Sequence, residues 1–239
     1  MTKVLLYSGG MDSWLIDKLW RPDKKIYVNI GGAYNEAEMH RLPDDVEVVD
    51  FSFLSQFELE NRFVPMRNLY FMMIASHYGD EICLGATAGD WGNNDKNPKF
   101  LDMADEMIGY LWSDKKAKRS VRICKDWINV SKQGLIDRYL AQGGSIEELK
   151  VATFSCYTPE NDRECMACYP CFRKFALLYA NGASYAYDER KKMWEYVRSQ
   201  IIPTREQGGY QGTYYTDRGS ESRTLIKAVN KLKGEFDVQ

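Results

Sequence analysis

The chain has very little histidine, little proline and no long hydrophobic run. Only two of its 239 residues are histidine, and seven are proline. The two histidines, His40 and His77, have no nucleophile beside them in the sequence, so we assign neither a catalytic role. The longest apolar stretch, residues 70–75, is far shorter than the roughly 18 residues that a membrane-spanning helix needs. We therefore expect no membrane partner.

An excess of charge of either sign is also missing. The chain has 32 lysines and arginines against 34 aspartates and glutamates, which gives a formal net charge of −2. A protein that binds nucleic acid through bulk electrostatics is usually basic, so the composition argues against nucleic acid as a partner. An anionic ligand would need a local site instead.

The N-terminal sequence has no hydrophobic segment long enough for a secretion signal. Three apolar residues, 4–6, follow Lys3 before polar residues return. We therefore expect a cytoplasmic protein, in which the six cysteines are thiols or metal ligands rather than disulfides.

Short apolar segments alternate with segments of helical periodicity in the first 140 residues. The expected strands are residues 4–7, 26–30, 46–49 and 81–85, with a fifth at 121–123 or 128–130. The expected helices are residues 12–19, 35–41, 68–77, 98–111 and 135–140. This alternation predicts the α/β class, as a doubly wound parallel sheet of about five strands with helices on both faces.

A glycine-rich turn follows the first expected strand. It comprises Ser8, Gly9, Gly10, Met11, Asp12 and Ser13. Glycines let backbone N–H groups approach a ligand closely, and the N-terminus of the following helix favours an anion. Asp12 would repel a bare phosphate, so we expect it either to hold Mg²⁺ or to cap the helix. Taken alone, the turn fits an ordinary strand-to-helix connection equally well.

Four of the six cysteines fall within 16 residues. They are Cys156, Cys165, Cys168 and Cys171. The spacing Cys-x8-Cys-x2-Cys-x2-Cys lets four thiolates converge on one tetrahedral ion, which would be structural because no coordination position stays open. An iron–sulfur cluster is the alternative, but the upstream position of the fourth ligand favours zinc. We interpret Cys83 and Cys124 as small buried residues.

Several short elements, taken in order, resemble known families. The glycine-rich turn resembles the pyrophosphate loop of the ATP-pyrophosphatase family, and residues 154–157 with 165–173 resemble the zinc segment of the 7-cyano-7-deazaguanine synthase family. Residues 65–68, Pro-Met-Arg-Asn, resemble that family's Pro-x-Arg-Asn element, and Ser131-Lys132 its Ser-Lys element. The resemblance covers about residues 4–182.

The resemblance implies an AMP-forming carbon–nitrogen ligase of queuosine-type deazapurine biosynthesis. Such an enzyme converts 7-carboxy-7-deazaguanine and ammonia into 7-cyano-7-deazaguanine, with ATP, Mg²⁺ and Zn²⁺ as cofactors. It adenylates the carboxylate, lets ammonia displace AMP, and adenylates the resulting amide so that a nitrile forms. By match to the motifs, the implied catalytic residues are Asp12, Ser13, Arg67 and Lys132. The implied cofactor-binding residues are Ser8, Gly9, Gly10, Met11, Asp12, Ser13 and Asn68.

Two stretches depart from the family pattern. Residues 32–38 contain neither the histidine nor the arginine of the family's Tyr-Gly-Gln-Arg-His run. Residues 93–100 keep Asp95, Pro98 and Phe100 of the Tyr-Pro-Asp-Cys-Arg-Pro-Glu-Phe run but lose its cysteine and arginine. Other functions therefore stay open: an AMP-forming enzyme that acts on another carboxylate, stops at the amide or thiolates a tRNA base, or a non-enzymatic, zinc-stabilised nucleotide-binding module.

The predicted organisation is one catalytic domain with a C-terminal extension. Residues 1–182 form the ATP-pyrophosphatase-type domain, which includes the zinc segment 154–173, and residues 183–239 form a helical and loop extension. Within the extension we expect a helix over 190–202 that ends at Pro203, a Gly/Tyr-rich loop over 207–215, and a helix over 224–232. We expect it to pack on the sheet or on a second copy of the chain, which leaves a homodimer open. A lid or nucleic-acid contact through its tyrosines and Arg218 or Arg223 is a secondary alternative.

Overall fold

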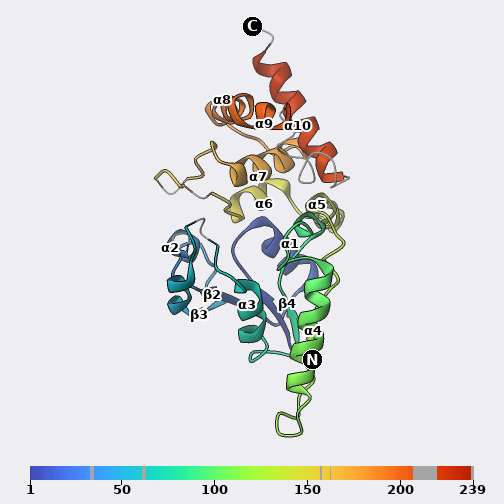
Figure 1. Cartoon of the computed structure of the whole chain (residues 1–239). Coiled ribbons are helices and arrows are strands. Elements are labelled where there is room, and N and C mark those ends of the chain that lie inside the picture. Colours follow the sequence, from blue (N-terminus) through green and yellow to red (C-terminus); the bar gives the residue numbers. More distant parts are fainter. Residues whose placement is uncertain (33–34, 61–62, 157, 162, 207–219, 238–239) are drawn as a thin grey trace. The chain divides into compact units, whose positions relative to one another are not determined.

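The computed structural model describes residues 1–32, 35–60, 63–156, 158–161, 163–206 and 220–237. The chain divides into two compact units, Met1–Val130 and Ser131–Gln239 (Figure 1). The predicted functional division at residue 182 falls inside the second unit, and it stays a prediction.

The first unit is built on a five-stranded parallel sheet. Its strands are β1 (Lys3–Leu6), β2 (Lys24–Asn29), β3 (Val46–Asp50), β4 (Glu81–Cys83) and β5 (Arg122–Ile123). They lie in the order β3-β2-β1-β4-β5, and every neighbouring pair is parallel. The predicted doubly wound α/β class is therefore confirmed, and the fifth strand is the first of the two predicted alternatives.

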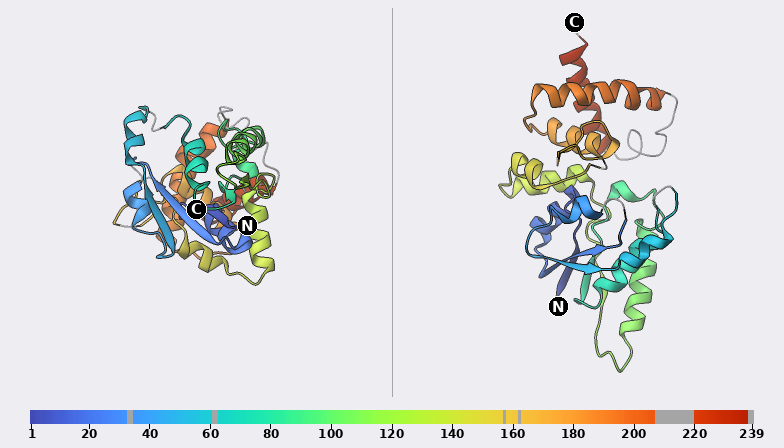
Figure 2. Two further views of the ribbon diagram at one scale, coloured as in Figure 1. Left: turned by 90° about the horizontal axis from the view of Figure 1, so that it is seen from below. Right: turned by 90° about the vertical axis from the view of Figure 1, so that its left-hand side faces the viewer.

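Helices cover both faces of this sheet. They are α1 (Met11–Trp20), α2 (Asn35–Met39), α3 (Arg67–Ala75) and α4 (Pro98–Trp112), with short 3₁₀ turns η1 (Ser52–Phe57) and η2 (Ala88–Asp90). Because side chains alternate along a strand, Val4 and Leu6 of β1 point to one face, where they share a buried core with residues of α3 and α4. Helix α1 contacts β1 from the other face (Figure 2).

The second unit is helical in the described residues. It contains α5 (Lys132–Ala141), α6 (Ile146–Ala152), α7 (Tyr169–Ala180), α8 (Tyr187–Tyr196), the π-helical turn η3 (Val197–Ile201), α9 (Ile202–Glu206) and α10 (Ser220–Phe236). Helix α10 packs against α5, α7 and α8. An ion pair joins α8 to α10, because Arg190 Nη2 lies 2.8 Å from Glu235 Oε1.

Predicted helix boundaries in the extension are wrong at Pro203 and at the start of the last helix. Pro203 does not end the helix but lies in the first turn of α9, directly after the π-helical turn. A missing N–H is tolerated best in a first helical turn, and the wider π turn changes which carbonyl the residue would meet. The last helix begins at Ser220 rather than at Thr224. The predicted Gly/Tyr-rich loop and Arg218 lie outside the described residues.

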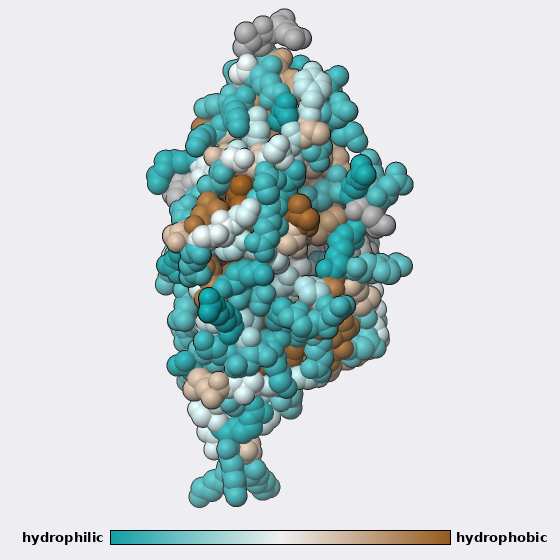
Figure 3. Space-filling model, turned by 180° about the vertical axis from the view of Figure 1, so that it is seen from behind, coloured by the Kyte–Doolittle hydropathy of each residue, from teal (hydrophilic) through white to brown (hydrophobic). Residues whose placement is uncertain are grey.

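Among the described residues, no helix has the length and apolar character needed to cross a membrane. On the face drawn in Figure 3, most side chains are hydrophilic, and apolar side chains show as separate patches.

Candidate functional site

The glycine-rich turn lies where the connections of the sheet reverse direction. From β1 the chain proceeds to β2 on one side, whereas β4 pairs with β1 on the other side. In doubly wound sheets, ligands bind at the carboxyl ends of the strands beside this switch point. Residues 7–10 leave the carboxyl end of β1 and enter α1, so the fold places the turn at the expected binding position.

Two serine hydroxyls tie the turn to the first turn of α1. The Ser8 backbone N–H donates to Ser13 Oγ at 3.2 Å, and Ser13 Oγ donates to the Gly10 carbonyl at 3.1 Å. The two hydroxyl oxygens lie 3.3 Å apart. Gly9 has a φ of +71°, a conformation that side-chain-bearing residues rarely adopt. The turn therefore has a defined shape that depends on glycine at position 9.

Asp12 is not the cap of α1. The N-cap residue is Gly10, and Asp12 is an acidic residue within the first helical turn. A carboxylate in this position interacts favourably with the positive end of the helix dipole. Met11 and Ser13 on either side are buried. Of the two predicted roles for Asp12, the capping role is thus contradicted, and the Mg²⁺ role stays a prediction.

The Arg67-Asn68 element begins helix α3. Asn68 is 2% exposed, and its Nδ2 donates to Asp95 Oδ2 at 2.7 Å and to the Asp95 carbonyl at 3.2 Å. The Arg67 guanidinium lies 5.9 Å from the ring centre of Phe71 on the same helix. The structure therefore joins two elements that the sequence resemblance quoted separately, because Asp95 belongs to the stretch after β4.

A polar cluster near Arg67 was not predicted from the sequence. The Tyr27 hydroxyl donates to Glu38 Oε2 at 2.8 Å, and Asn35 Nδ2 donates to the Tyr27 hydroxyl at 2.5 Å. Burial raises the pKa of Glu38, and the Tyr27 hydrogen bond and the Arg67 charge only partly oppose it. Burial and the nearby Glu38 charge raise the pKa of Tyr27. The sequence offered one indication of this cluster: Asn35 and Glu38 both lie in the stretch that departs from the family pattern.

Lys132 lies in the second unit. It is the first residue of α5, whose N-cap Ser131 accepts a hydrogen bond from the Gly134 N–H at 3.0 Å. Its side chain is buried, at 8% exposure. The Ser-Lys element therefore forms a capped helix start, and the predicted contact of Lys132 with phosphate stays a prediction.

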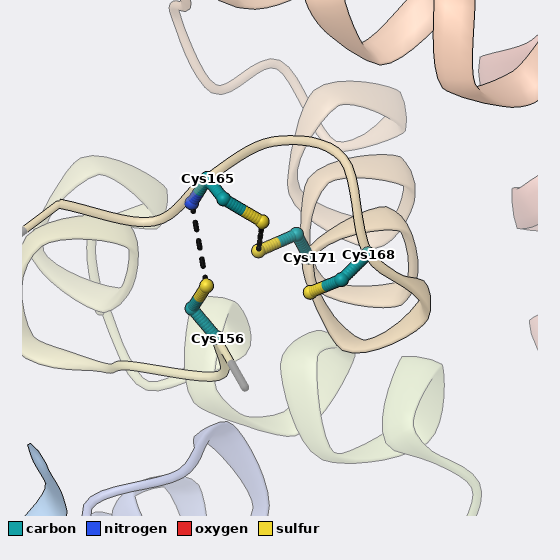
Figure 4. A group of neighbouring side chains, drawn as sticks. All are labelled: Cys156, Cys165, Cys168 and Cys171. Carbon is teal, nitrogen blue, oxygen red and sulfur yellow. Dashed lines mark hydrogen bonds between the residues drawn. The ribbon is translucent and has the colours of Figure 1, made fainter. Parts of the chain in front are cut away.

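The four clustered cysteines converge as their spacing predicted. One ligand atom from each, its Sγ, lies within 4.8 Å of those of the other three. Figure 4 shows the side chains pointing toward one another, with Cys156 approaching from a separate segment. Cys168 is the N-cap of α7, and Cys171 lies in that helix's first turn. The fold thus brings the segments around Cys156 and Cys165 to the N-terminal end of α7.

The donor set fits a zinc ion. Backbone N–H groups already point at sulfur: the Cys165 N–H donates to Cys156 Sγ at 3.3 Å, and the Ala167 N–H donates to Cys165 Sγ at 3.4 Å. Burial raises the pKa of Cys156 to about 11, and the hydrogen bond with Cys168 together with burial raises the pKa of Cys171. A divalent cation favours the thiolate forms, and four thiolates in tetrahedral reach are a typical structural zinc site.

Comparisons with known proteins point to one family. The model of the family described as queuosine biosynthesis protein QueC matches residues 33–181. Two curated proteins named 7-cyano-7-deazaguanine synthase, from Leptospira interrogans serovar copenhageni strain Fiocruz L1-130 and serovar Lai strain 56601, are each 28% identical over 137 residues. The matched part covers 55% of this chain and 55% of each relative, so the chain spans about half the length of these relatives. No solved structure matches the chain.

Proposed function

Because the chain belongs to the queuosine biosynthesis protein QueC family, we propose that it converts 7-carboxy-7-deazaguanine and ammonia into 7-cyano-7-deazaguanine with ATP. The observation that carries the proposal is the turn Ser8–Ser13 at the switch point of the sheet, where an anionic leaving group would bind. The names of the two relatives support the reaction. In this proposal the protein is a cytoplasmic AMP-forming carbon–nitrogen ligase.

The turn would act on the leaving pyrophosphate. When a carboxylate oxygen attacks the α-phosphorus of ATP, negative charge develops on the departing pyrophosphate. Backbone N–H groups at Gly9, Gly10 and the start of α1 would stabilise that charge, together with the hydroxyls of Ser8 and Ser13. Asp12 would hold Mg²⁺, which would supply positive charge against the negative charge of the phosphates.

Adenylation explains how an unreactive carboxylate becomes a nitrile. A carboxylate oxygen is a poor leaving group, whereas AMP is a good one. Ammonia attacks the acyl adenylate, AMP leaves, and the ammonia nitrogen loses a proton to give the amide. The amide oxygen then attacks a second ATP, and the loss of AMP and of the remaining N–H protons leaves the carbon–nitrogen triple bond. Each nitrile therefore consumes two ATP.

The remaining predicted residues have supporting roles. Arg67 and Asn68 would border the nucleotide or the substrate, with Asn68 held by its bonds to Asp95. Lys132 would neutralise phosphate charge as it develops. The four cysteines would hold Zn²⁺ with no open coordination position, so this ion would stabilise the fold and take no part in the chemistry.

A second candidate is an enzyme with the same adenylation chemistry and another acceptor substrate. One observation favours it: Asn35 and Glu38, which lie in the stretch that departs from the family pattern, are both hydrogen-bonded to Tyr27 on β2. A changed pocket there would alter the substrate without altering the ATP loop.

The test is the release of AMP and pyrophosphate from ATP in the presence of 7-carboxy-7-deazaguanine and ammonium. We expect substrate-dependent AMP formation that falls by at least about 100-fold in Ser13→Ala and Asp12→Asn, in line with lost transition-state stabilisation. Asp44→Asn, at an exposed position outside the turn, is the matched control and should retain full activity. Unchanged AMP formation in the Asp12 variant would contradict the role of the turn.

A further inference from the structure

An ion pair between a buried lysine and a partly buried glutamate lies beside the four-cysteine cluster. Lys174 on α7 is 3% exposed, and its Nζ lies 3.1 Å from both carboxylate oxygens of Glu164. Moving a charge such as the Lys174 ammonium out of water is costly, so it persists there only where opposite charge and hydrogen-bond acceptors surround it. Both side chains of this pair also form hydrogen bonds with nearby backbone groups.

The pair joins three separate stretches of backbone. Besides Glu164, the Lys174 ammonium donates to the carbonyl of Thr153, directly after α6. The Glu164 carboxylate in turn accepts a hydrogen bond from the Ser155 N–H at 2.7 Å. One buried ammonium and one partly buried carboxylate therefore connect residues 153–155, residue 164 and helix α7.

Those three stretches are the ones that carry the cysteines. Ser155 directly precedes Cys156, and Glu164 directly precedes Cys165. Lys174 follows Cys171 by three residues, so it lies about one turn further along the same side of α7. The pair thus contacts the backbone next to the first two cysteines and the helix that begins at Cys168 and carries Cys171.

We propose that Lys174 and Glu164 are positioning residues that pre-organise the four-cysteine metal centre. They fix the segments so that four thiolates, which repel one another, face a common point before the ion binds. Residues that orient metal ligands from outside the coordination sphere commonly change metal affinity 10- to 100-fold when replaced. This inference rests on the proposed metal centre.

The experiment measures the affinity of the full chain for Zn²⁺ and Co²⁺ by competition with a chelator of known affinity. Cobalt also reports coordination geometry through its visible absorption. We expect Lys174→Met to weaken binding of both ions about 10- to 100-fold. Glu164→Gln keeps an acceptor for the Ser155 N–H and should stay within a few-fold of the wild-type affinity.

Two further variants separate positioning from stability. In Lys174→Met/Glu164→Met both charges are removed, and such apolar replacements are often neutral for stability. We expect this double variant to unfold in urea near the wild-type midpoint but to bind metal at least 10-fold more weakly. The control is Lys192→Met, which removes a largely exposed ion pair, Lys192 with Glu160 at 3.5 Å, that also joins the cysteine segment to α8. It should leave metal affinity unchanged.

The outcomes separate the two proposals. Wild-type metal affinity in the double variant, or in Lys174→Met, would overturn the positioning role while leaving the metal centre intact. A wild-type chain that binds neither ion through thiolates would overturn the metal centre and this inference with it.

Discussion

Asn68 Nδ2 lies 2.7 Å from Asp95 Oδ2 and 3.2 Å from the Asp95 carbonyl oxygen. This contact joins the start of α3 to the stretch after β4. Asn68 is nearly fully buried, so its side-chain amide cannot bond to water. Asp95 supplies the hydrogen-bond acceptors that the buried amide needs. The relationship assigns Asn68 a structural role in holding the stretch that carries Asp95, in addition to its proposed place beside the nucleotide.

Replacing Asn68 should destabilise the first unit. Asn68→Ala removes both donors and leaves the Asp95 carboxylate with fewer partners, which costs about 1–3 kcal/mol. Asn68→Asp should cost more, because it places two carboxylates in contact. Urea unfolding provides the measurement, with the exposed Asn94→Ala in the same stretch as control. Equal stability of Asn68→Ala and wild type would show that the contact has no structural value.

The conformation of Gly9 predicts that a side chain there would destabilise the protein without touching any neighbouring residue. A Cβ at Gly9 would meet nothing within 4 Å, but the residue has a φ of +71°. Gly9→Ala should therefore destabilise the protein by about 1–2 kcal/mol through backbone strain alone. It should also lower AMP formation, because relaxation of the strain would move the N–H groups of the turn.

Gly92→Ala is the matched control for this prediction. A Cβ at Gly92 also meets nothing within 4 Å, and its φ lies outside the left-handed region. We expect unchanged or slightly higher stability, because alanine restricts the unfolded chain. Similar losses in both variants would refute the assignment of strain to position 9.

Glu38 should make stability depend on pH. Burial raises its pKa above the ordinary value of 4.5, so the folded protein holds this proton more tightly than the unfolded chain does. The stabilising effect is complete below pH 4.5 and is lost as the pH rises through the raised pKa. Glu38→Gln stays neutral at every pH, so its stability relative to wild type should increase as the pH rises from 4 to 8.

The measurement is the urea midpoint of both proteins across that pH range. Glu36→Gln changes an exposed carboxylate on the same helix and should follow the wild-type pH dependence. A stability difference between Glu38→Gln and wild type that stays constant with pH would contradict a raised pKa of Glu38 in the folded protein.

Removal of the proposed zinc ion should affect the second unit selectively. Without the ion, the buried thiols regain protons, since the pKa of Cys156 is raised to about 11 and that of Cys171 is also raised. Metal affinity should therefore rise with pH, because binding displaces protons. After chelation, hydrogen exchange measured by mass spectrometry should accelerate in α7 and the segment before it, while β1 and β4 keep their protection. Equal acceleration in both units would contradict this picture.

Local sequence patterns predicted the sheet and the cysteine cluster for clear physical reasons. Buried parallel strands appear as short apolar runs such as residues 4–7, and two-residue cysteine gaps restrict where thiolates can meet. The Pro203 boundary was wrong because the rule that proline ends helices ignores the π turn before it.

Pairs of polar residues could not be predicted in the same way. Glu38 and Tyr27, or Lys174 and Glu164, look like ordinary surface or core residues in the sequence. They become partners only because tertiary packing brings their polar atoms to within 2.8 Å and 3.1 Å of each other. Helix α7 was not predicted either, since the cysteine spacing indicates ligands rather than secondary structure.

The mass spectrum of the reaction product, with AMP counted alongside, tests the central claim most directly. The reaction contains the protein, ATP, Mg²⁺, ammonium and 7-carboxy-7-deazaguanine. Our account predicts a product that has gained one ammonia and lost two waters, with two AMP formed per product. A product that has lost only one water would show that the enzyme stops at the amide. The absence of both a deazaguanine product and AMP would contradict the proposed function.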